Sequence, residues 1–245
     1  MHRLIVDVGN TNIKFGLFSN DKLTNVICIH THTYSYTKLK KILNIEKCKK
    51  IYVGSVVKEL TTRLVQDLHL ITQTYITVIK PIDFKSVFNL TKFPIKEIGV
   101  DILGLALIVK HLYNKGVGIS FGTATFAIIV NKQNLIGAAI APSINLGIRQ
   151  LQITTSLIKK VNTKIGNLNF GKNTLTALRS GGSHMAQGFI MSIFNYAHKH
   201  YHINQTLITG GKMIHLKFVK NLPNTDILDN AVLLGYYQLV KTIWA

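Results

Sequence analysis

Two short stretches of the sequence share one pattern, and this repeat constrains the fold more than any other feature. Residues 4–18, LIVDVGNTNIKFGLF, and residues 118–130, GISFGTATFAIIV, both place a glycine and short polar residues between alternating apolar runs. Such alternation around a polar interruption predicts a strand, a tight turn and a second strand. Asp7–Thr11 aligns with Ser120–Ala124, almost half the chain away. The chain is therefore expected to contain two related halves.

Hydrophobic periodicity predicts the same order of elements in each half. In the first half we expect strands at 2–9, 12–19, 23–30, 50–56 and 74–79, and helices at 37–47, 58–70 and 100–115. In the second half we expect strands at 117–122, 125–131, 135–141 and 206–211, a helical region over 144–161, a loop at 162–173, helices within 174–201 interrupted at Gly181 and Gly182, and a helix at 229–244. Antiparallel strands followed by alternating helices and strands predict an α/β fold with two domains, 1–115 and 116–245, and a cleft between them.

Composition excludes several classes of protein. The 245 residues are 47% hydrophobic and 16% charged, which is typical of globular proteins. The longest apolar run, 102–109, is too short to span a membrane and predicts a buried helix. The N-terminus has no signal-peptide pattern, so we expect a cytoplasmic protein. Cys28 and Cys48 are in no metal-binding motif, and we expect free buried thiols.

The formal net charge of +19 raises the possibility of a nucleic-acid partner. Only four of the 29 basic residues are arginine, however, and arginine is the residue that reads bases and phosphates most often. The lysines are scattered except in the segment 38–50, which is typical of a solvated helix face. We therefore expect no membrane partner and regard nucleic-acid binding as the less favoured alternative.

The two hairpins have a chemistry of their own. Glycine lets a phosphate approach the backbone closely, and the turn offers N–H groups and short polar side chains. Asp7, at the end of the first strand, can hold a magnesium ion directly or through water. The strand at 206–211 ends in Gly210 and Gly211, a flat surface suited to an adenosine. Two such hairpins facing each other across a cleft would grip a nucleotide triphosphate from both sides.

Six motifs in this order, DVGNTNIKFG, IGVD, FGTAT, GAAIAPS, SGG and LITGG, resemble the type III pantothenate kinases over essentially the whole chain. The resemblance implies two ribonuclease-H-like domains of the actin-like ATPase superfamily and a homodimer. It also implies ATP-dependent phosphorylation of pantothenate, the first committed step of coenzyme A biosynthesis, with Mg²⁺ and a monovalent cation, K⁺ or NH₄⁺.

The resemblance assigns roles to individual residues. Asp101 is expected to act as the general base on the pantothenate hydroxyl, although an acid at the start of an apolar helix is also typical of an N-cap. Asp7 and Ser120 are the expected metal ligands. Residues expected to bind the nucleotide are Asp7, Gly9, Asn10, Thr11, Asn12, Lys14, Gly122, Thr123, Thr125, Gly210 and Gly211, and those expected at the substrate are Gly99, Val100, Asp101 and Ile102.

The chain departs from the family pattern at charged positions. Ile102 stands where the family has arginine, Ser120 and Ile128 stand where it has aspartates, and Ser143 replaces a glycine. Loss of a cation from a desolvated anion site is costly. Lys14, Lys96 and Arg149 are possible replacements, and for each we favour a solvated surface cation.

These departures leave alternatives open. One is a catalytically weakened or inactive homologue acting as an accessory or regulatory protein, and another is a kinase for a different small molecule. His198 and His202 are spaced for a metal, but surface histidines are favoured because no third ligand is evident.

Overall fold

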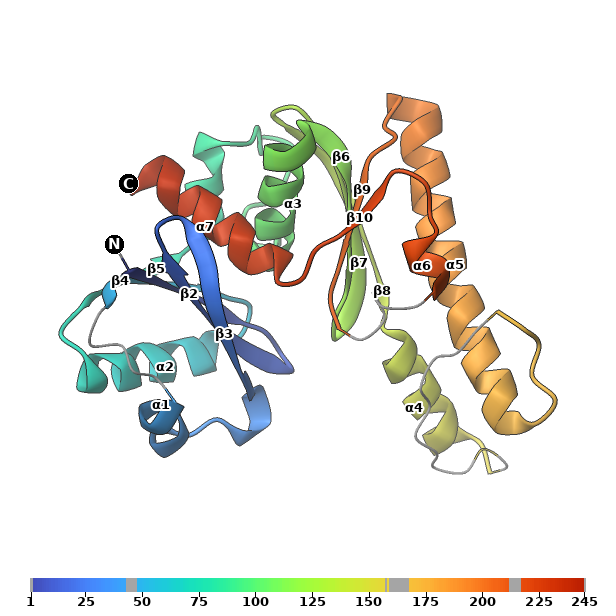
Figure 1. Cartoon of the computed structure of the whole chain (residues 1–245), viewed down its shortest axis with the longest axis horizontal. Coiled ribbons are helices and arrows are strands. Elements are labelled where there is room, and N and C mark those ends of the chain that lie inside the picture. Colours follow the sequence, from blue (N-terminus) through green and yellow to red (C-terminus); the bar gives the residue numbers. More distant parts are fainter. Residues whose placement is uncertain (1, 43–47, 157, 159–167, 212–216, 245) are drawn as a thin grey trace. The chain divides into compact units, whose positions relative to one another are not determined.

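The computed structural model describes residues 2–42, 48–156, 158, 168–211 and 217–244 (Figure 1). Contacts divide the chain into two compact units. Unit 1 contains Met1–His111 together with Ala231–Ala245, and unit 2 contains Leu112–Asn230. The expected division between residues 115 and 116 placed the last helix in the second half, whereas the contacts assign this helix to unit 1.

Unit 1 contains a five-stranded sheet in the order β3-β2-β1-β4-β5. The first three strands are antiparallel, and β1, β4 and β5 run parallel. The strands are β1 (His2–Val8), β2 (Asn12–Ser19), β3 (Lys22–His30), β4 (Cys48–Ser55) and β5 (Tyr75–Ile79). The helices are η1 (Thr31–Thr33), α1 (Tyr36–Ile42), α2 (Lys58–Ile71), η2 (Pro81–Ser86), α3 (Val100–Tyr113), whose last two residues belong to unit 2, and α7 (Ala231–Ile243).

Successive side chains of a strand point to opposite faces of the sheet, so each face of this sheet has its own cover. Leu4, Val6 and Val8 of β1 join a core with residues of α1 and α2. The other face is covered by α7, as Figure 1 shows. There Tyr237 stacks on Phe18 with ring centroids 4.0 Å apart. The Asp7 side of β1 therefore faces α7.

Unit 2 has a second five-stranded sheet, in the order β10-β9-β6-β7-β8. Residues of α4, α5 and α6 share a hydrophobic core with β6, β7 and β9. The strands are β6 (Lys115–Phe121), β7 (Ala124–Asn131), β8 (Asn134–Pro142), β9 (Thr206–Thr209) and β10 (Thr225–Ile227), and the helices are α4 (Ile144–Thr154), α5 (Thr174–Tyr201) and α6 (Lys217–Lys220).

Two helices of unit 2, α4 and α5, begin at side-chain caps. Ser143 accepts a hydrogen bond from the N–H of Leu146 at 3.2 Å, which satisfies one of the free donors at the start of α4. Asn173 and Thr176 form a capping box at the start of α5. Ser143, one of the departures from the family pattern, thus has a local structural role.

The expected α/β class and the order of the main elements are confirmed, with three corrections to the elements. The helix 174–201 is continuous through Gly181 and Gly182, because its buried face packs in the hydrophobic core of unit 2. The helical region after Pro142 ends at Thr154, within the described residues. Short elements α6 and β10 were not expected.

Other expectations have mixed outcomes. The helix expected at 37–47 ends at Ile42, and residues 43–47 lie outside the described part of the chain. Most of the loop expected at 162–173 also lies outside it. Cys48 is buried as expected, but Cys28 is exposed, because β3 is the edge strand of its sheet. In the described part of the chain, no helix is long and apolar enough to cross a membrane.

Candidate active site

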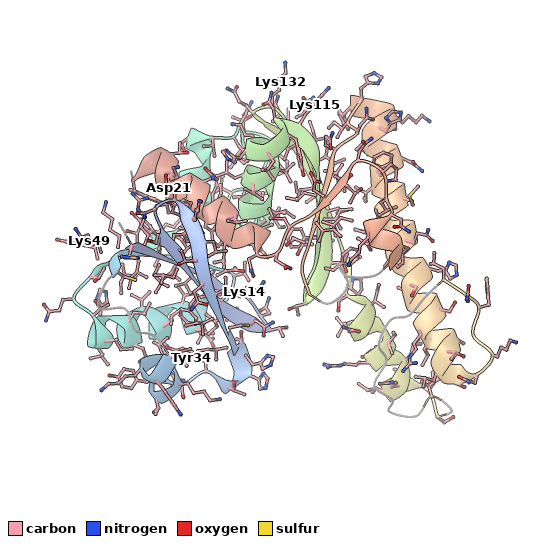
Figure 2. All side chains as sticks on the ribbon, in the orientation of Figure 1. Lys14, Asp21, Tyr34, Lys49, Lys115 and Lys132 are labelled. Carbon is pink, nitrogen blue, oxygen red and sulfur yellow. The ribbon has the colours of Figure 1, made fainter. Side chains whose placement is uncertain are left out.

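The candidate active site in unit 1 begins with a row of side chains across the sheet. Asp7 of β1 lies directly opposite Lys14 of β2 on one side and Gly54 of β4 on the other. Lys14 in turn lies opposite Cys28 of β3. Residues directly opposite in neighbouring strands share a face of the sheet, so this row lies on the face that α7 covers. Figure 2 labels Lys14 within it.

The turn between β1 and β2 is closed by backbone hydrogen bonds. The N–H of Gly9 donates to the carbonyl of Asn12 at 2.9 Å, and the hydroxyl of Thr31 donates to the carbonyl of Gly9 at 2.7 Å. Asn10 and Thr11 are exposed at its tip. The Oδ1 atom of Asn12 is buried and has no hydrogen-bond partner among the described residues. A buried acceptor without a partner is typical of a site that a ligand completes.

Asp101 lies in the first turn of α3, so it is not the residue that caps this helix. Its Oδ1 atom accepts a hydrogen bond from the N–H of Ile102 at 2.9 Å. A Cβ atom at Gly99 would lie 2.3 Å from this Oδ1 atom. The carboxylate can adopt this position because residue 99 is glycine.

The charge of Asp101 acts on the carboxylate of Asp7. Burial, and after it the charge of Asp101, raise the pKa of Asp7 from 3.8 to about 7, against the lowering effect of the Lys14 charge. Burial also raises the pKa of Asp101, while N–H groups of Ile102 and of Asp101 itself hold it down. When both carboxylates of this centre are ionised, the single lysine beside Asp7 leaves a net negative charge, which a bound cation would compensate.

This centre fits a magnesium ion. Mg²⁺ usually binds through one or two carboxylates and keeps several of its water ligands. The described residues contain no cluster of three or more His, Cys, Asp or Glu side chains, so any cation would depend on this pair and on water or phosphate oxygens. His198 and His202 likewise belong to no such cluster.

The second hairpin lies in unit 2. The N–H of Gly122 donates to the carbonyl of Ala124 at 3.0 Å, which closes its turn. Thr123 is exposed at the tip, whereas Thr125 and Ser120 are buried. Ser120 lies opposite Thr209 of β9, so its hydroxyl is a neutral oxygen without a neighbouring carboxylate on these strands.

Gly210 and Gly211 lie against the same hairpin. Gly210 has a φ of 97°, which favours glycine, and a Cβ atom there would lie 2.6 Å from the carbonyl oxygen of Phe121. The backbone after β9 therefore reaches the start of the hairpin only because both positions lack a side chain. Unit 2 thus brings together the glycines and threonines that the sequence assigned to the nucleotide.

The structure also shows whether the residues that depart from the family pattern, and their possible replacements, are buried or exposed. Ile102 and Ile128 are buried apolar side chains, so neither replaces the charge that the family pattern has at its position. Lys96 and Arg149 are exposed, in agreement with surface cations. Lys14 is half-buried beside Asp7, so its interpretation as a solvated surface cation is corrected.

Sequence reasoning missed Tyr236 of α7, which is fully buried and whose pKa is raised well above its usual range by burial and by Asp7 and Asp101. It also missed Gly54 and Gly104, which border the tyrosine ring. The pair of tyrosines after Gly235, in a mostly apolar helix, is the only signal in the sequence, and it does not distinguish packing from function.

Comparisons with known proteins agree on one family. A family model described as type III pantothenate kinase matches residues 3–196. The chain is 32% identical to a type III pantothenate kinase of Malacoplasma penetrans, over 96% of this chain and 95% of that protein. It is also 32% identical to one of Mycoplasma mobile, over 97% and 99% of the two chains.

Solved structures share the fold. A crystal structure from Campylobacter jejuni, named for the Baf family of transcriptional activators, matches with a TM-score of 0.63 and 17% identity over 97% of both chains. A Listeria monocytogenes protein named as an N-acetylmannosamine kinase matches with a TM-score of 0.52 and 13% identity, over 98% of this chain and 99% of that one.

Proposed function

Because the chain belongs to the type III pantothenate kinase family, we propose that it transfers the γ-phosphoryl group of ATP to the hydroxyl of pantothenate, the first step of coenzyme A biosynthesis. The observation that carries this proposal is the pairing of Asp7 and Asp101 in unit 1. Phosphoryl transfer needs a base for the acceptor hydroxyl and positive charge for the phosphates. The pair offers a carboxylate for each task.

Asp101 is the proposed general base. Burial raises its pKa, which makes the carboxylate a stronger proton acceptor than an exposed aspartate. The N–H of Ile102 donates to its Oδ1 atom, which fixes the orientation of the carboxylate that is proposed to accept the proton of the substrate hydroxyl. Gly99 supports this geometry because it leaves room for the carboxylate.

Asp7 and Lys14 are the proposed phosphate side of the site. A magnesium ion bound at Asp7 supplies positive charge to the phosphates. Lys14 provides a second, permanent cation in the same row of the sheet. The Gly9–Asn12 turn contributes its exposed polar tip and the unpaired Oδ1 atom of Asn12.

The nucleotide is proposed to use unit 2 as well. Gly122, Thr123 and Thr125 form a tight hairpin, and Gly210 and Gly211 lie against its start. Backbone without side chains lets phosphate and adenosine approach closely. A monovalent cation, K⁺ or NH₄⁺, is part of the proposal, with Ser120 as a neutral ligand.

We further expect a homodimer that forms through unit 2. Large apolar side chains are exposed there on the edge strand β8 and on α4, and exposure of several such groups on neighbouring elements is typical of an association surface. The most exposed of them are Ile140 (68%) and Ile153 (77%). We also expect the protein to be located in the cytoplasm.

The direct test of the substrate is identification of the product. The purified protein is incubated with pantothenate, ATP, Mg²⁺ and K⁺, and the mixture is analysed by mass spectrometry. The expected product is 4′-phosphopantothenate together with ADP. Phosphorylation of a different small molecule, with none of pantothenate, would overturn the assigned substrate.

A further inference from the structure

Tyr236 has a position that packing alone does not explain. Its side chain is fully buried, and its ring lies between Gly54 of β4 and Gly104 of α3. A Cβ atom at Gly54 would lie 2.3 Å from the ring, and one at Gly104 would lie 2.8 Å from it. Two glycines on separate elements therefore make the space that this ring occupies.

The hydroxyl of Tyr236 is directed toward the row of residues that contains Asp7. A Cβ atom at Gly54 would lie 2.9 Å from this hydroxyl, and Gly54 is the residue directly opposite Asp7 on the neighbouring strand. Burial and the charges of Asp7 and Asp101 raise the pKa of Tyr236 well above its usual range. A tyrosine hydroxyl is protonated at neutral pH without any such shift, so it is available as a donor.

Among the described residues, this hydroxyl has no hydrogen-bond partner. A buried tyrosine hydroxyl normally has one, because leaving it unpaired costs free energy. The next residue shows the ordinary case: Tyr237 donates to Asp21 and accepts from Arg3. Phenylalanine would fill the space of Tyr236 without that cost, so the hydroxyl needs a reason beyond packing.

The charges that act on this hydroxyl are those of Asp7 on β1 and Asp101 on α3, and Lys14 on β2 lies opposite Asp7. Lys14 has no acceptor atom. Asp101 has one oxygen engaged by the N–H of Ile102. Asp7 lies directly opposite Gly54, the residue whose Cβ position would be 2.9 Å from the hydroxyl, so Asp7 is the acceptor that we assign to it.

We propose that Tyr236 is a positioning residue, whose hydroxyl donates a hydrogen bond to the Asp7 carboxylate in the loaded protein and fixes the orientation in which Asp7 binds a divalent cation. This proposal rests on the proposed function in so far as the cation serves phosphoryl transfer. The binding of the cation itself does not require turnover, so the two can be tested apart.

The test compares Tyr236→Phe with the matched control Tyr237→Phe. Thermal unfolding is followed during titration with Mg²⁺ alone, because a ligand of the folded state raises the melting temperature as its concentration rises. We expect Tyr236→Phe to melt at or above the wild-type temperature without Mg²⁺. The Mg²⁺ concentration that produces a given rise in melting temperature is expected to increase roughly tenfold, the usual effect of one hydrogen bond to a charged group.

Kinetics add a second readout. Tyr236→Phe is expected to lower kcat about tenfold at fixed Mg²⁺ while the KM for pantothenate changes less than about twofold, in line with one lost bond to a charged group. Tyr237→Phe is expected to do the opposite: a lower melting temperature from the loss of its bonds to Asp21 and Arg3, with unchanged Mg²⁺ dependence and kcat.

The outcomes separate the proposals. A wild-type Mg²⁺ dependence in Tyr236→Phe would overturn the role of Tyr236, as would a lower melting temperature of this variant without Mg²⁺, since the hydroxyl would then have a partner in the free protein. A wild-type protein that Mg²⁺ does not stabilise would also overturn it. Absence of wild-type turnover would count against the proposed function alone, because the Mg²⁺ titration still tests Tyr236.

Discussion

Asp7 is an acidic residue in a strand whose sequence, HRLIVDV, is otherwise mostly apolar. A polar group that loses water without full compensation destabilises a fold. Burial and the nearby Asp101 both disfavour the charge of Asp7, and only Lys14 favours it. A metal-free protein with Asp7 ionised is therefore less stable than the same fold with a neutral residue, and this cost is expected at a site that binds a cation.

Asp7→Asn should accordingly raise the melting temperature of the metal-free protein and abolish its stabilisation by Mg²⁺. The pKa of Asp7 is about 7 in the fold and near 3.8 in the unfolded chain. The unfolded chain thus ionises first, and the contribution of Asp7 to stability falls as pH rises from about 4 to 7. At about 1.4 kcal/mol per pKa unit, the upper limit of this loss is roughly 4 kcal/mol.

Calorimetry with EDTA at a series of pH values checks this prediction. The melting temperatures of Asp7→Asn and the wild type should be similar near pH 4 and should diverge toward pH 8, with the variant more stable. A variant that melts below the wild type at pH 8 would show that the Asp7 charge is compensated in the free protein.

Some residues of the site could be predicted from the sequence and others could not. Asp7 and Asp101 were found because acids are scarce in this chain and these two lie in motifs. The contact of Lys14 with the site depends on the strand register, and that of Tyr236 on the packing of α7 onto β4 and α3. Neither of these long-range contacts can be predicted from the local sequence pattern.

At the scale of elements, the approach of α3 to α7 depends on glycine. A Cβ atom at Gly235 would lie 1.8 Å from the carbonyl oxygen of Gly104. Because the atom it would meet belongs to a helix backbone, no side-chain rotation relieves the contact. The two helices come this close only without a side chain at residue 235, and this approach sets the position of Tyr236.

Gly235→Ala should therefore destabilise unit 1. Overpacking of a core typically costs about 1–3 kcal/mol, which corresponds to a melting temperature lower by roughly 3–10 °C in a protein of this size. The matched control is Gly181→Ala in α5, where a Cβ atom would meet nothing within 4 Å. Alanine is the better helix former by about 1 kcal/mol, so this control should melt slightly higher. Equal melting temperatures for both variants would contradict the close approach of α3 and α7.

Most elements could be predicted because their periodicity is strong and their ends have turn residues. The strands of both hairpins and the helix α3 agree with expectation to within about two residues. The errors have physical causes: Gly181 and Gly182 are poor helix formers locally, yet α5 continues through them because its buried face packs on the sheet of unit 2. The strand β10 has three residues and pairs only with β9, so its own sequence carries little signal.

At the scale of the whole molecule, the exposed apolar side chains of unit 2 predict association. Ile153→Lys on α4 should convert the expected dimer to a monomer, because a charge at a buried contact is strongly unfavourable. Leu70→Lys on α2 of unit 1 changes an equally exposed side chain (73%) and should leave the dimer intact. Size-exclusion chromatography with light scattering distinguishes the two. A monomeric wild type, or a dimer in both variants, would contradict the assignment of the interface to α4.

The central claim is that Asp7 and Asp101 form the centre of a pantothenate kinase although Ile102, Ser120 and Ile128 lack the charges of the family pattern. The most direct measurement is pantothenate-dependent ADP formation by the purified protein with ATP, Mg²⁺ and high K⁺, alongside Asp101→Asn, which keeps the size of the side chain. We predict turnover by the wild type and none by a variant that melts at a similar temperature. No pantothenate-dependent turnover by the folded wild type, or near-normal turnover by Asp101→Asn, would contradict it.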